Sequence, residues 1–533
     1  MIKKGKKKKI LEKREFMQFN EWISRMYPEL HKLRSGKDRI SGKLNTLTRS
    51  FTFQVTDKCN LACTYCYQIN KSTRRMKLED AKLAVDKLLS GADGFHDYIN
   101  PEKSPGIVLE FIGGEPFLEI ELIDQIVDYF REQAILLNHP WANKFCISIC
   151  SNGVLYTDKR VQKFLQKNNG VISFSVTVDG VQELHDKCRI FPDGRPSYHL
   201  AHGAAMDWMS RGYYMGSKIT ISPENITYVA ESLEQMIQDG YTDINANFVY
   251  EEGWELKHAT ECYKQIKMFT DKTLMDFDMN DYAISFLTNN GEPMPCTDNK
   301  NWCGGTGDML SMDPDGYLYP CIRYMESSLG NERQPLRIGN IHTGLLQKPD
   351  EKKCIDCMNA VTRRSQSTDE CWYCPVAQGC GWCSGYNYQT FGTVNKRTTF
   401  TCIMHKARSL ATAYYTNKHI ASGDSGTPKN VYLSEDEAVE IIGKEQYDEL
   451  VAITEAVGGK INKTGKHQAF VYKVSDKGFE STKFFDISNK KELAQVIEEE
   501  KKLIQEETDN TDAFVADAKE KFEKLKESRS KLL

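Results

Sequence analysis

Between about residues 50 and 280, short apolar runs alternate with longer stretches whose apolar residues recur at helical spacing. Because strands that alternate with helices form a parallel sheet with the helices outside, we expect an α/β fold. Six such units are fewer than the eight of a closed barrel, so the pattern predicts a partial (βα)6 barrel of the TIM type, with functional residues at the carboxyl ends of its strands. The predicted strands are 50–55, 107–112, 145–150, 171–178, 216–221 and 244–250, and the predicted helices are 77–90, 118–137, 157–168, 197–210, 224–238 and 258–278.

The pattern changes in the second half of the chain. From 291 to about 415 long helical patterns are absent and Gly and Cys residues cluster, so bound metal is the expected source of stability. After about residue 420 the sequence predicts a helix at 434–457, two strand-like runs and a charged helix to the end. We therefore divide the chain into a basic N-terminal segment at 1–49, the barrel at 50–285, a Cys-rich domain at 286–415 and a small α+β and helical extension at 420–533.

Composition narrows the class of protein. Charged residues make up 27% of the chain, the mean hydropathy is −0.53, and no apolar run reaches the roughly 18 residues that a membrane helix needs. The first residues, MIKKGKKKKILEKREF, are basic but lack the apolar region of a secretory signal, so we expect a cytoplasmic protein without a membrane partner. In a reducing compartment the 17 cysteines predict metal ligands or catalytic thiols rather than disulfides.

The first 50 residues carry 15 Lys and Arg against five Asp and Glu. One interpretation is a solvated leader, and the other is a basic arm that steers an acidic partner. The aromatic residues Phe16, Phe19, Trp22 and Tyr27 follow at near-helical spacing, which favours a docked amphipathic helix over a nucleic-acid-binding face. We therefore expect no nucleic-acid partner.

Three cysteines follow the first predicted strand directly, in the spacing C-x3-C-x2-C: Cys59, Cys63 and Cys66. Three thiolates can hold three irons of a [4Fe–4S] cluster and leave the fourth iron open for another ligand. A zinc site would normally take a fourth protein ligand nearby, and the sequence offers none there. The motif resembles that of the radical S-adenosylmethionine (radical SAM) enzymes, which implies that these three cysteines are the catalytic metal ligands.

Further residues match that family's pattern at the ends of the next strands. The segment that begins Gly113-Gly114-Glu115 resembles the family's methionine-binding GGEP, although Gly-Gly at a strand end is also common turn chemistry. The resemblance implies that S-adenosylmethionine is bound and reductively cleaved to a 5′-deoxyadenosyl radical that abstracts hydrogen from a C–H bond. An ordinary surface ion pair is the alternative for Arg189. The full set of expected contacts is Tyr65, Gly113, Gly114, Glu115, Ser151, Asn152, Thr177 and Arg189.

A second group of cysteines resembles the SPASM extension, which binds two auxiliary [4Fe–4S] clusters and would bring the total to three. The resemblance assigns Cys303, Cys321 and Cys383 to the first auxiliary cluster, and Cys371, Cys374, Cys380 and Cys402 to the second. Here two residues separate Cys380 from Cys383, where the family usually has three. Zinc knuckles are the alternative, since Cys-x-x-Cys pairs suit zinc as well.

The fourth ligand of the first auxiliary cluster is open. Cys296 matches a position that some relatives use, Cys354 and Cys357 form an additional pair on a predicted polar loop, and a substrate thiolate is the third choice. The four remaining cysteines lie in predicted strands or helices, where we expect buried, inert thiols: Cys146, Cys150, Cys188 and Cys262.

The substrate class is indicated by one position and two stretches. Sulfatase-maturing relatives carry an Asp after the equivalent of Cys321, whereas this chain has Ile322, which cannot accept a proton. The stretches 301–330 and 363–389 resemble peptide maturases whose targets carry Cys-x-x-x repeats. This resemblance implies thioether crosslinks in a ribosomally made, Cys-rich precursor peptide, with flavodoxin or ferredoxin as electron donor.

Two other interpretations remain open. One is a radical SAM dehydrogenase of Ser or Cys in a protein substrate, and the other is a non-catalytic Fe–S or zinc scaffold. Residues 425–490 are either a module that binds the leader of the peptide, by addition to a sheet edge, or a plain stabilising appendage.

Overall fold

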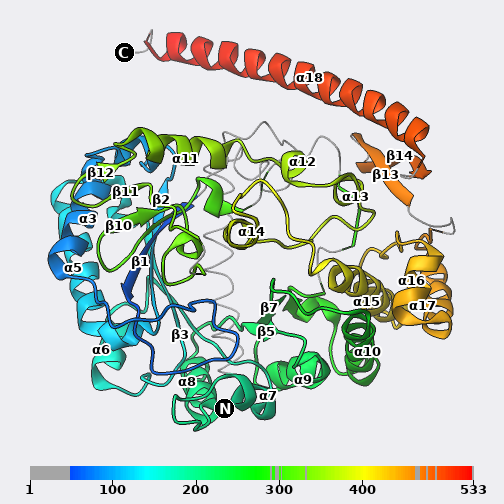
Figure 1. Cartoon of the computed structure of the whole chain (residues 1–533), viewed down its shortest axis with the longest axis horizontal. Helices are drawn as coiled ribbons and strands as arrows, with labels where there is room; N and C mark the ends of the chain where they lie inside the picture. Colours follow the sequence, from blue (N-terminus) through cyan, green and yellow to red (C-terminus); the bar gives the residue numbers. More distant parts are fainter. Residues whose placement is uncertain are drawn as a thin grey trace.

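The computed structural model describes residues 48–287, 291–294, 299, 301, 303–330, 333–462, 468–475, 478–486 and 489–530. The predicted basic segment and Cys296 lie outside these residues. Mixed α/β architecture with a largely parallel main sheet confirms the predicted fold class (Figure 1). None of the helices in the described part of the chain is both long enough and apolar enough to cross a membrane.

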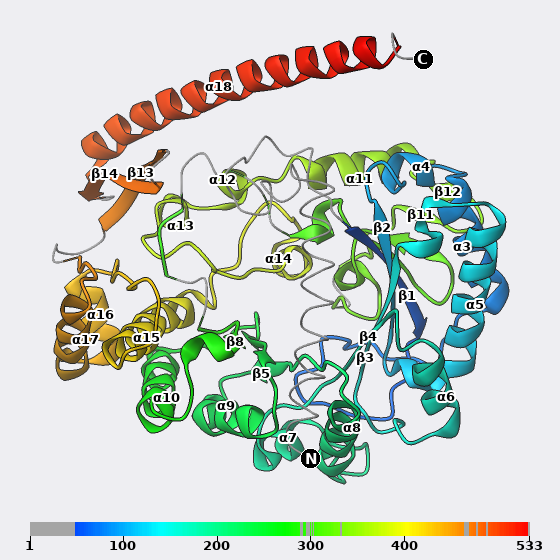
Figure 2. The same ribbon diagram turned by 180° about the vertical axis from the view of Figure 1, so that it is seen from behind.

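Four parallel strands form the first half of the barrel. In strands β1 to β3 alternate residues are apolar and fully buried, so that Phe53, Phe111 and Ile149 lie side by side in register. The outer face of these strands is covered by α3, α5 and α6 (Figure 2). The strands are β1 (Thr48–Thr56), β2 (Gly106–Gly113), β3 (Phe145–Ser151) and β4 (Ile172–Val176); the helices are α3 (Leu78–Ser90), α4 (Phe95–Tyr98), α5 (Ile120–Leu136), α6 (Lys159–Lys167), α7 (Gln182–Cys188) and α8 (Tyr198–Ser210).

The second half of the barrel has shorter strands in separate pairs. The predicted strand 244–250 is wrong as one unit, because Asn245 separates β6 from β7 and the two pair with different partners. Among the described strands, β5 pairs with β7 and β6 with β8, both parallel, and neither pair is hydrogen-bonded to β4. The elements are β5 (Ile219–Ile221), α9 (Val229–Gln238), β6 (Asp243–Ile244), β7 (Ala246–Phe248), α10 (Leu256–Thr273) and β8 (Ala283–Ile284).

Strands from the Cys-rich region extend the barrel sheet beyond β1. Strand β9 (Leu310–Met312) pairs parallel to β1, with Leu310 opposite Phe51. Strands β10 (Tyr317–Tyr319), β11 (Gly339–Asn340) and β12 (Gly344–Leu345) follow in antiparallel order and complete an eight-stranded sheet. The Cys-rich region is therefore built onto the barrel through main-chain hydrogen bonds rather than only through side-chain packing.

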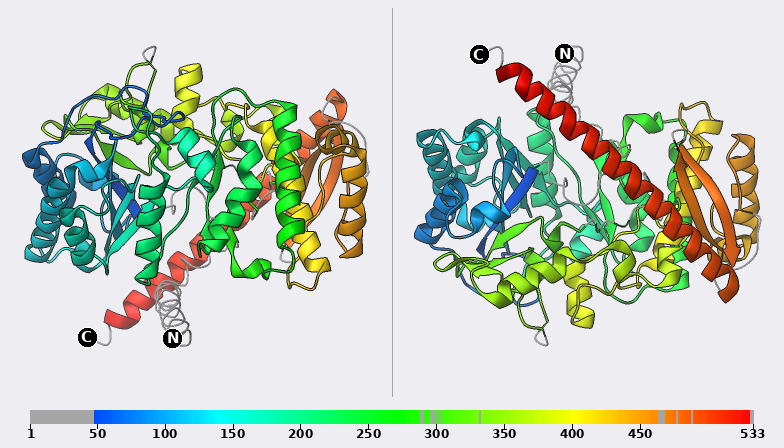
Figure 3. Two further views of the ribbon diagram at one scale, coloured as in Figure 1. Left: turned by 90° about the horizontal axis from the view of Figure 1, so that it is seen from below. Right: turned by 90° about the horizontal axis from the view of Figure 1, so that it is seen from above.

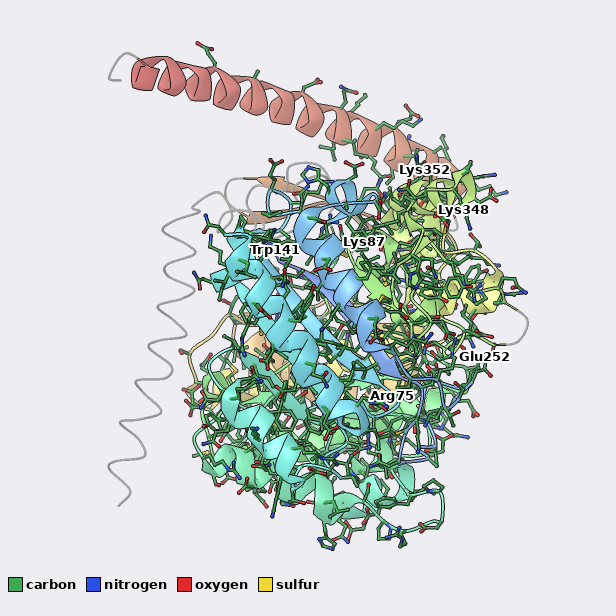
Figure 4. The ribbon with its side chains drawn as sticks, turned by 90° about the vertical axis from the view of Figure 1, so that its left-hand side faces the viewer. Arg75, Lys87, Trp141, Glu252, Lys348 and Lys352 are labelled. Carbon is green, nitrogen blue, oxygen red and sulfur yellow. The ribbon has the colours of Figure 1, made fainter. Side chains whose placement is uncertain are left out.

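A buried lysine strengthens this junction. The Nζ of Lys87 on α3 pairs with the Asp93 carboxylate at 2.7 Å and also donates to the carbonyl oxygen of Ile341, which follows β11. On the same side of the molecule, the indole N–H of fully buried Trp141 donates to the Ser104 carbonyl oxygen at 2.7 Å (Figure 4). The Lys87 contacts thereby join helix α3 of the barrel to the chain that follows β11.

The rest of the Cys-rich region is more helical than the sequence predicts. Cys402 begins a helix of 20 residues, so the expectation that long helices are absent before residue 415 is wrong at this point. Cys354 and Cys357 lie on α11 and not on a loop. The helices are α11 (Pro349–Asn359), α12 (Arg363–Gln366), α13 (Asp369–Trp372), α14 (Ser384–Phe391) and α15 (Cys402–Ala421).

The first helical part of the C-terminal extension, residues 435–456, lies at the opposite end of the molecule from α3 and α5 (Figure 1). The predicted helix 434–457 is in fact two helices, α16 (Glu435–Ile442) and α17 (Lys444–Ala456), because Gly443 lies between them with a φ of +80°. Strands β13 (Gln468–Ser475) and β14 (Gly478–Asp486) form an antiparallel hairpin. Helix α18 (Lys490–Ser530) then runs from the hairpin across one face of the molecule (Figure 3). Single-turn 3₁₀ helices are η1 (Pro116–Glu119), η2 (Pro140–Asn143), η3 (Ile226–Tyr228), η4 (Met279–Asp281), η5 (Gly304–Thr306) and η6 (Ile322–Tyr324).

Candidate functional site

The Cys59–Cys66 loop leaves the carboxyl end of β1 and is fixed by backbone hydrogen bonds to the chain after β4. The amide of Ala62 donates to the Ile190 carbonyl oxygen at 2.7 Å, and that of Thr64 donates to the Cys188 carbonyl oxygen at 2.9 Å. Burial, together with the neighbouring Cys59 and Cys66 thiolates, raises the pKa of the Cys63 thiol to about 11, although the charge of Arg189 acts in the opposite direction. The three sulfurs therefore lie close together in a partly buried loop, where only a strong positive charge would keep all three ionised.

The carboxylate of Glu115 joins the ends of β2 and β3. Glu115 is 1% exposed and accepts hydrogen bonds from the Ser151 hydroxyl at 2.8 Å, the Asn152 amide at 2.9 Å and the Phe117 amide at 3.1 Å. Burial raises the pKa of Glu115 above its ordinary value, although these hydrogen bonds act in the opposite direction. Its charge also contributes to the raised pKa of Cys59, so this carboxylate lies beside the cysteine loop.

The two glycines before Glu115 allow a close backbone approach. A Cβ at Gly114 would lie 2.4 Å from the Lys58 carbonyl oxygen, and a Cβ at Gly113 would lie 2.8 Å from that of Thr56. The Glu115 amide donates to the Lys58 carbonyl oxygen at 2.9 Å. The glycines thus let the end of β2 pack directly against the chain that leads into Cys59.

Arg189 connects the cysteine loop to the end of β4. Its Nε donates to the Asp179 carboxylate at 2.9 Å and to the Tyr65 hydroxyl at 2.7 Å, and its Nη1 lies 3.8 Å from the Cys63 sulfur. The Tyr65 hydroxyl also donates to Asp179. Burial alone would lower the pKa of Arg189, but the Asp179 carboxylate and the Cys63 thiolate raise it above its ordinary value. A buried guanidinium is therefore fixed beside the cysteine sulfurs.

Cys303, Cys321 and Cys383 form a second group, next to the sheet junction. A Cβ at Gly305 would lie 3.1 Å from the Cys321 Cβ and 3.5 Å from the Cys303 sulfur. Burial raises the pKa of Cys321 to about 12, and the thiolates of Cys383 and Cys303 contribute to this shift. The side chain of Arg323, two residues after Cys321, acts in the opposite direction on the pKa of Cys383.

Cys371, Cys374, Cys380 and Cys402 form a third group, between α13 and the first turn of α15. Burial raises the pKa of Cys402, as do the thiolates of Cys380 and Cys371. The guanidinium of Arg397 donates to the Cys380 carbonyl oxygen at 3.2 Å and lowers the pKa of both Cys371 and Cys402. Thiol groups that gather beside a buried cation are suited to bind a metal cluster as thiolates.

Residues 48–191 match the model of the 4Fe-4S single cluster domain family. The chain is 29% identical over 192 residues to an uncharacterized protein of Methanocaldococcus jannaschii, a match covering 36% of this chain and 59% of that protein. It is 32% identical over 142 residues to the serine-type anaerobic sulfatase-maturating enzyme of Bacteroides thetaiotaomicron, which covers 26% of this chain and 31% of that enzyme. A longer match, 21% identical over 408 residues, is to the radical SAM cyclopropyl synthase TigE of Paramaledivibacter caminithermalis and covers 71% of this chain and 77% of the synthase.

A solved structure has the same fold. Native anSMEcpe with bound AdoMet (S-adenosylmethionine) superposes with a TM-score of 0.51 at 17% identity, and the match covers 70% of this chain and all of that one. In sequence and fold the chain is thus similar to radical SAM enzymes of the SPASM type, and it spans less than two thirds of the length of the first two relatives. A [4Fe–4S] cluster and S-adenosylmethionine are the cofactors that these similarities support.

The residues expected to contact S-adenosylmethionine lie around the Cys59–Cys66 loop at the ends of β1 to β4. Besides the contacts above, the Asn152 side-chain amide donates to Asn60 at 2.6 Å, and the Thr177 hydroxyl lies 3.3 Å from the Cys150 sulfur. Asp179 and Asn60 were not predicted, although Asp179 follows β4 directly and the carboxyl ends of strands were the expected location. The assignment of Tyr65, Gly113, Gly114, Glu115, Ser151, Asn152, Thr177 and Arg189 as cofactor contacts stays a prediction.

The side chains that are present fit a [4Fe–4S] cluster at each cysteine group. Each group offers three or four thiols, and Arg189, Arg323 or Arg397 lies beside it. Among the described residues, no three His, Cys, Asp or Glu side chains are arranged to hold a single metal ion. A cluster takes one thiolate for each iron, so three or four thiols in each group suit a [4Fe–4S] cluster.

Of the four cysteines that were expected to be buried and inert, one differs from that expectation. Cys188 and Cys262 are buried and Cys146 is half-buried, but Cys150 is exposed, so its predicted burial is wrong. Residues of β3 alternate between the core and the opposite face, and Cys150 belongs to that opposite face next to Thr177. Cys354 and Cys357 are neighbours on α11, and burial raises the pKa of Cys354 to about 11.

Proposed function

We propose that this protein is a radical SAM peptide maturase that installs thioether crosslinks between cysteines and carbon atoms of a ribosomally made, Cys-rich precursor peptide. The observation that carries the proposal is the position of Tyr67, which follows the radical-site cysteines and lies under the guanidinium of Arg323, near Cys321 of the first auxiliary group. Burial raises the pKa of Tyr67, and the thiolates of Cys66 and Cys321 add to that shift, so the side chain lies between both cysteine groups. A substrate at this point would be within reach of both.

The charges at this point favour a substrate thiolate over a substrate alcohol. The Arg323 guanidinium lies 5.2 Å from the centre of the Tyr67 ring and 5.9 Å from that of Tyr386. Its Nε is buried without a hydrogen-bond partner among the described residues, and its ion pair with the exposed Glu251 is long, at 3.8 Å. A cation stabilises a thiolate, whereas a dehydrogenase needs a base, which Ile322 cannot provide.

Each part of the site has a task in this reaction. Cys59, Cys63 and Cys66 would hold the radical cluster, and Tyr65, Glu115, Ser151, Asn152, Thr177 and Arg189, with the Gly113–Gly114 backbone, would hold S-adenosylmethionine. When bound, the cluster and S-adenosylmethionine supply the 5′-deoxyadenosyl radical that removes a hydrogen atom from the acceptor carbon. Arg323 would hold the substrate sulfur as a thiolate beside the first auxiliary group. Attack of this thiolate on the carbon radical would form the C–S bond, and the one electron left over would pass to the auxiliary clusters when they are bound.

The remaining cysteines are assigned to clusters that transfer electrons. Cys303, Cys321 and Cys383 would bind one auxiliary [4Fe–4S] cluster, and Cys371, Cys374, Cys380 and Cys402 a second, with flavodoxin or ferredoxin as the external donor. The fourth ligand of the first auxiliary cluster would be Cys296, one of Cys354 and Cys357, or the substrate thiolate. A protein with three clusters would contain about twelve iron ions per chain.

Anaerobic reconstitution with a candidate Cys-x-x-x peptide tests the proposal. We expect each crosslink to remove two hydrogens and one alkylatable thiol, as measured by mass spectrometry after alkylation. Loss of two hydrogens with every thiol still alkylatable would instead support the radical dehydrogenase of Ser or Cys. A protein that binds zinc but no iron would support the non-catalytic scaffold. Substituting Cys59, Cys63 or Cys66 by Ala should abolish 5′-deoxyadenosine formation.

A further inference from the structure

Helix α18, the last element of the C-terminal extension, packs against the third cysteine group. Trp372 and Tyr373 are the two residues between Cys371 and Cys374, and both are buried, at 4% and 2% exposure. They pack against Val496 of α18, which is fully buried, and against Leu493 and Leu503 of the same helix. This apolar contact joins segments that are more than 100 residues apart in the sequence.

A carboxylate from α18 binds both residues of the Cys371–Cys374 loop. Glu500 accepts a hydrogen bond from the Trp372 indole N–H at 2.6 Å and another from the Tyr373 hydroxyl at 2.7 Å. Glu500 is itself only 6% exposed, whereas Glu498 and Glu499 beside it are exposed. A buried carboxylate is costly unless its oxygens are hydrogen-bonded, and here each oxygen has a donor from the loop.

The opposite side of the loop is held by α12. The Arg363 guanidinium lies 3.7 Å from the centre of the Trp372 ring, and its Nη1 donates to the Trp372 carbonyl oxygen at 3.4 Å. Arg364 lies within 5.8 Å of the centres of both the Trp372 and Tyr373 rings and pairs with Asp369 at 2.8 Å. The two aromatic rings therefore lie among two cations of α12 and one anion of α18.

We propose that α18 is a structural strap for the second auxiliary cluster, and that Glu500 is a positioning residue that fixes the Cys371–Cys374 loop in its ligand-binding conformation. Trp372 and Tyr373 can adopt few other positions while both of their polar groups are bound to one carboxylate. Cys371 and Cys374, on either side of them, are then held in place for the same reason. The C-terminal extension thereby supports a metal site rather than serving as a detached appendage. This inference rests on the proposed auxiliary cluster at this cysteine group, but it does not depend on the peptide or on thioether formation.

The test uses the full chain with Cys59, Cys63 and Cys66 replaced by Ala, so that any iron it holds belongs to the auxiliary groups. In this background we compare Glu500→Ala and Glu500→Gln with Glu499→Gln, a matched change on the exposed face of the same helix. We expect about eight iron ions per chain in the parent and in Glu499→Gln. In Glu500→Ala we expect the content to fall about twofold, with loss of one of two EPR signals after reduction. Glu500→Gln keeps one acceptor oxygen and should retain more iron than Glu500→Ala.

The outcomes separate the strap from simpler alternatives. If Glu500→Ala loosens α18 to proteolysis but keeps both EPR signals and their reduction potentials, the helix only docks and the proposal is overturned. If the parent holds no iron, the auxiliary clusters themselves are absent, and the strap fails together with that part of the proposed function. Should Glu500→Ala fail to fold, Trp372→Phe removes one donor and keeps the ring. This variant should show the same selective change in one EPR signal, and unchanged spectra in it would overturn the proposal.

Discussion

Arg189 and Asp179 form an ion pair in which 2.9 Å separate the guanidinium Nε from the carboxylate Oδ2. The Asp179 side chain is fully buried, and Arg189 also contacts Tyr65 and Cys63. Through this pair the end of β4 sets the position of a cation beside the radical-site cysteines. A buried pair of this kind is most sensitive to the loss of one member, because the other charge is then left uncompensated.

We expect Asp179→Asn to weaken S-adenosylmethionine binding by about tenfold or more, since Arg189 would lose its fixed orientation. Equilibrium binding to the anaerobically reconstituted protein measures the effect. Asp193→Asn is the matched control, because Asp193 and Arg195 form an exposed pair at 2.8 Å on the same segment, and such pairs contribute little. Equal affinity in Asp179→Asn and the native protein would contradict a role for this pair in cofactor binding.

His185 contacts Asp179 of the same ion pair, and its burial predicts that the stability of the protein depends on pH. The backbone amide of Asp179 lies 3.3 Å from Nδ1 of His185, and Nε2 lies 3.0 Å from the Ser197 hydroxyl, so the ring is expected to be neutral. Burial lowers the pKa of His185 from 6.5 to about 3, and the charge of Arg189 acts in the same direction. Between these values the unfolded chain binds a proton that the folded chain does not bind. The stability contributed by this group is therefore complete above about pH 6.5 and is lost as the pH falls toward about 3.

His185→Gln should flatten the acid side of the stability profile. Melting temperatures measured from pH 7 down to pH 4.5 should fall less steeply for this variant than for the native protein. His199→Gln, an exposed residue nearby, is the control and should leave the slope unchanged. A native slope in His185→Gln would show that another group controls the acid limit.

Gly114 predicts a steric effect at the entrance to the cysteine loop. In Gly114→Ala the new Cβ would lie 2.4 Å from the Lys58 carbonyl oxygen and 2.7 Å from that of Asp57, both main-chain atoms that cannot rotate away. We expect a loss of about 1–3 kcal/mol in the free energy of unfolding and reduced iron binding at Cys59. Gly170→Ala is the control, since a Cβ there meets no atom within 4 Å. Similar melting temperatures in the two variants would contradict the close approach.

The sequence predicts β1 to β4 and the residues that follow them because one rule decides both. Buried parallel strands have strong apolar runs, and their carboxyl ends lie at one edge, so Cys59, Glu115, Asn152 and Arg189 could be expected near each other. The pairing of β9 with β1 could not be predicted, because three residues carry little periodicity and their partner lies about 250 positions away. The same holds for Glu500, which on its own helix is one glutamate in the run Glu498–Glu500. Only the tertiary contact with Trp372 and Tyr373 distinguishes it.

Arg323 gives the prediction that bears most directly on the reaction. A guanidinium beside the substrate sulfur lowers the pKa of that thiol. The rate of thioether formation should therefore reach its plateau at a lower pH than it would for a thiol without a neighbouring cation. In Arg323→Gln the thiol would ionise at a higher pH, and the rise of kcat/KM with pH should shift upward by about one unit, with a loss of about tenfold at neutral pH. Arg323→Lys keeps the charge and should restore part of the rate, whereas 5′-deoxyadenosine formation without peptide should remain native in both variants. An unshifted pH profile in Arg323→Gln, with equal loss at every pH, would mean that Arg323 packs against Tyr67 and Tyr386 without acting on the substrate sulfur.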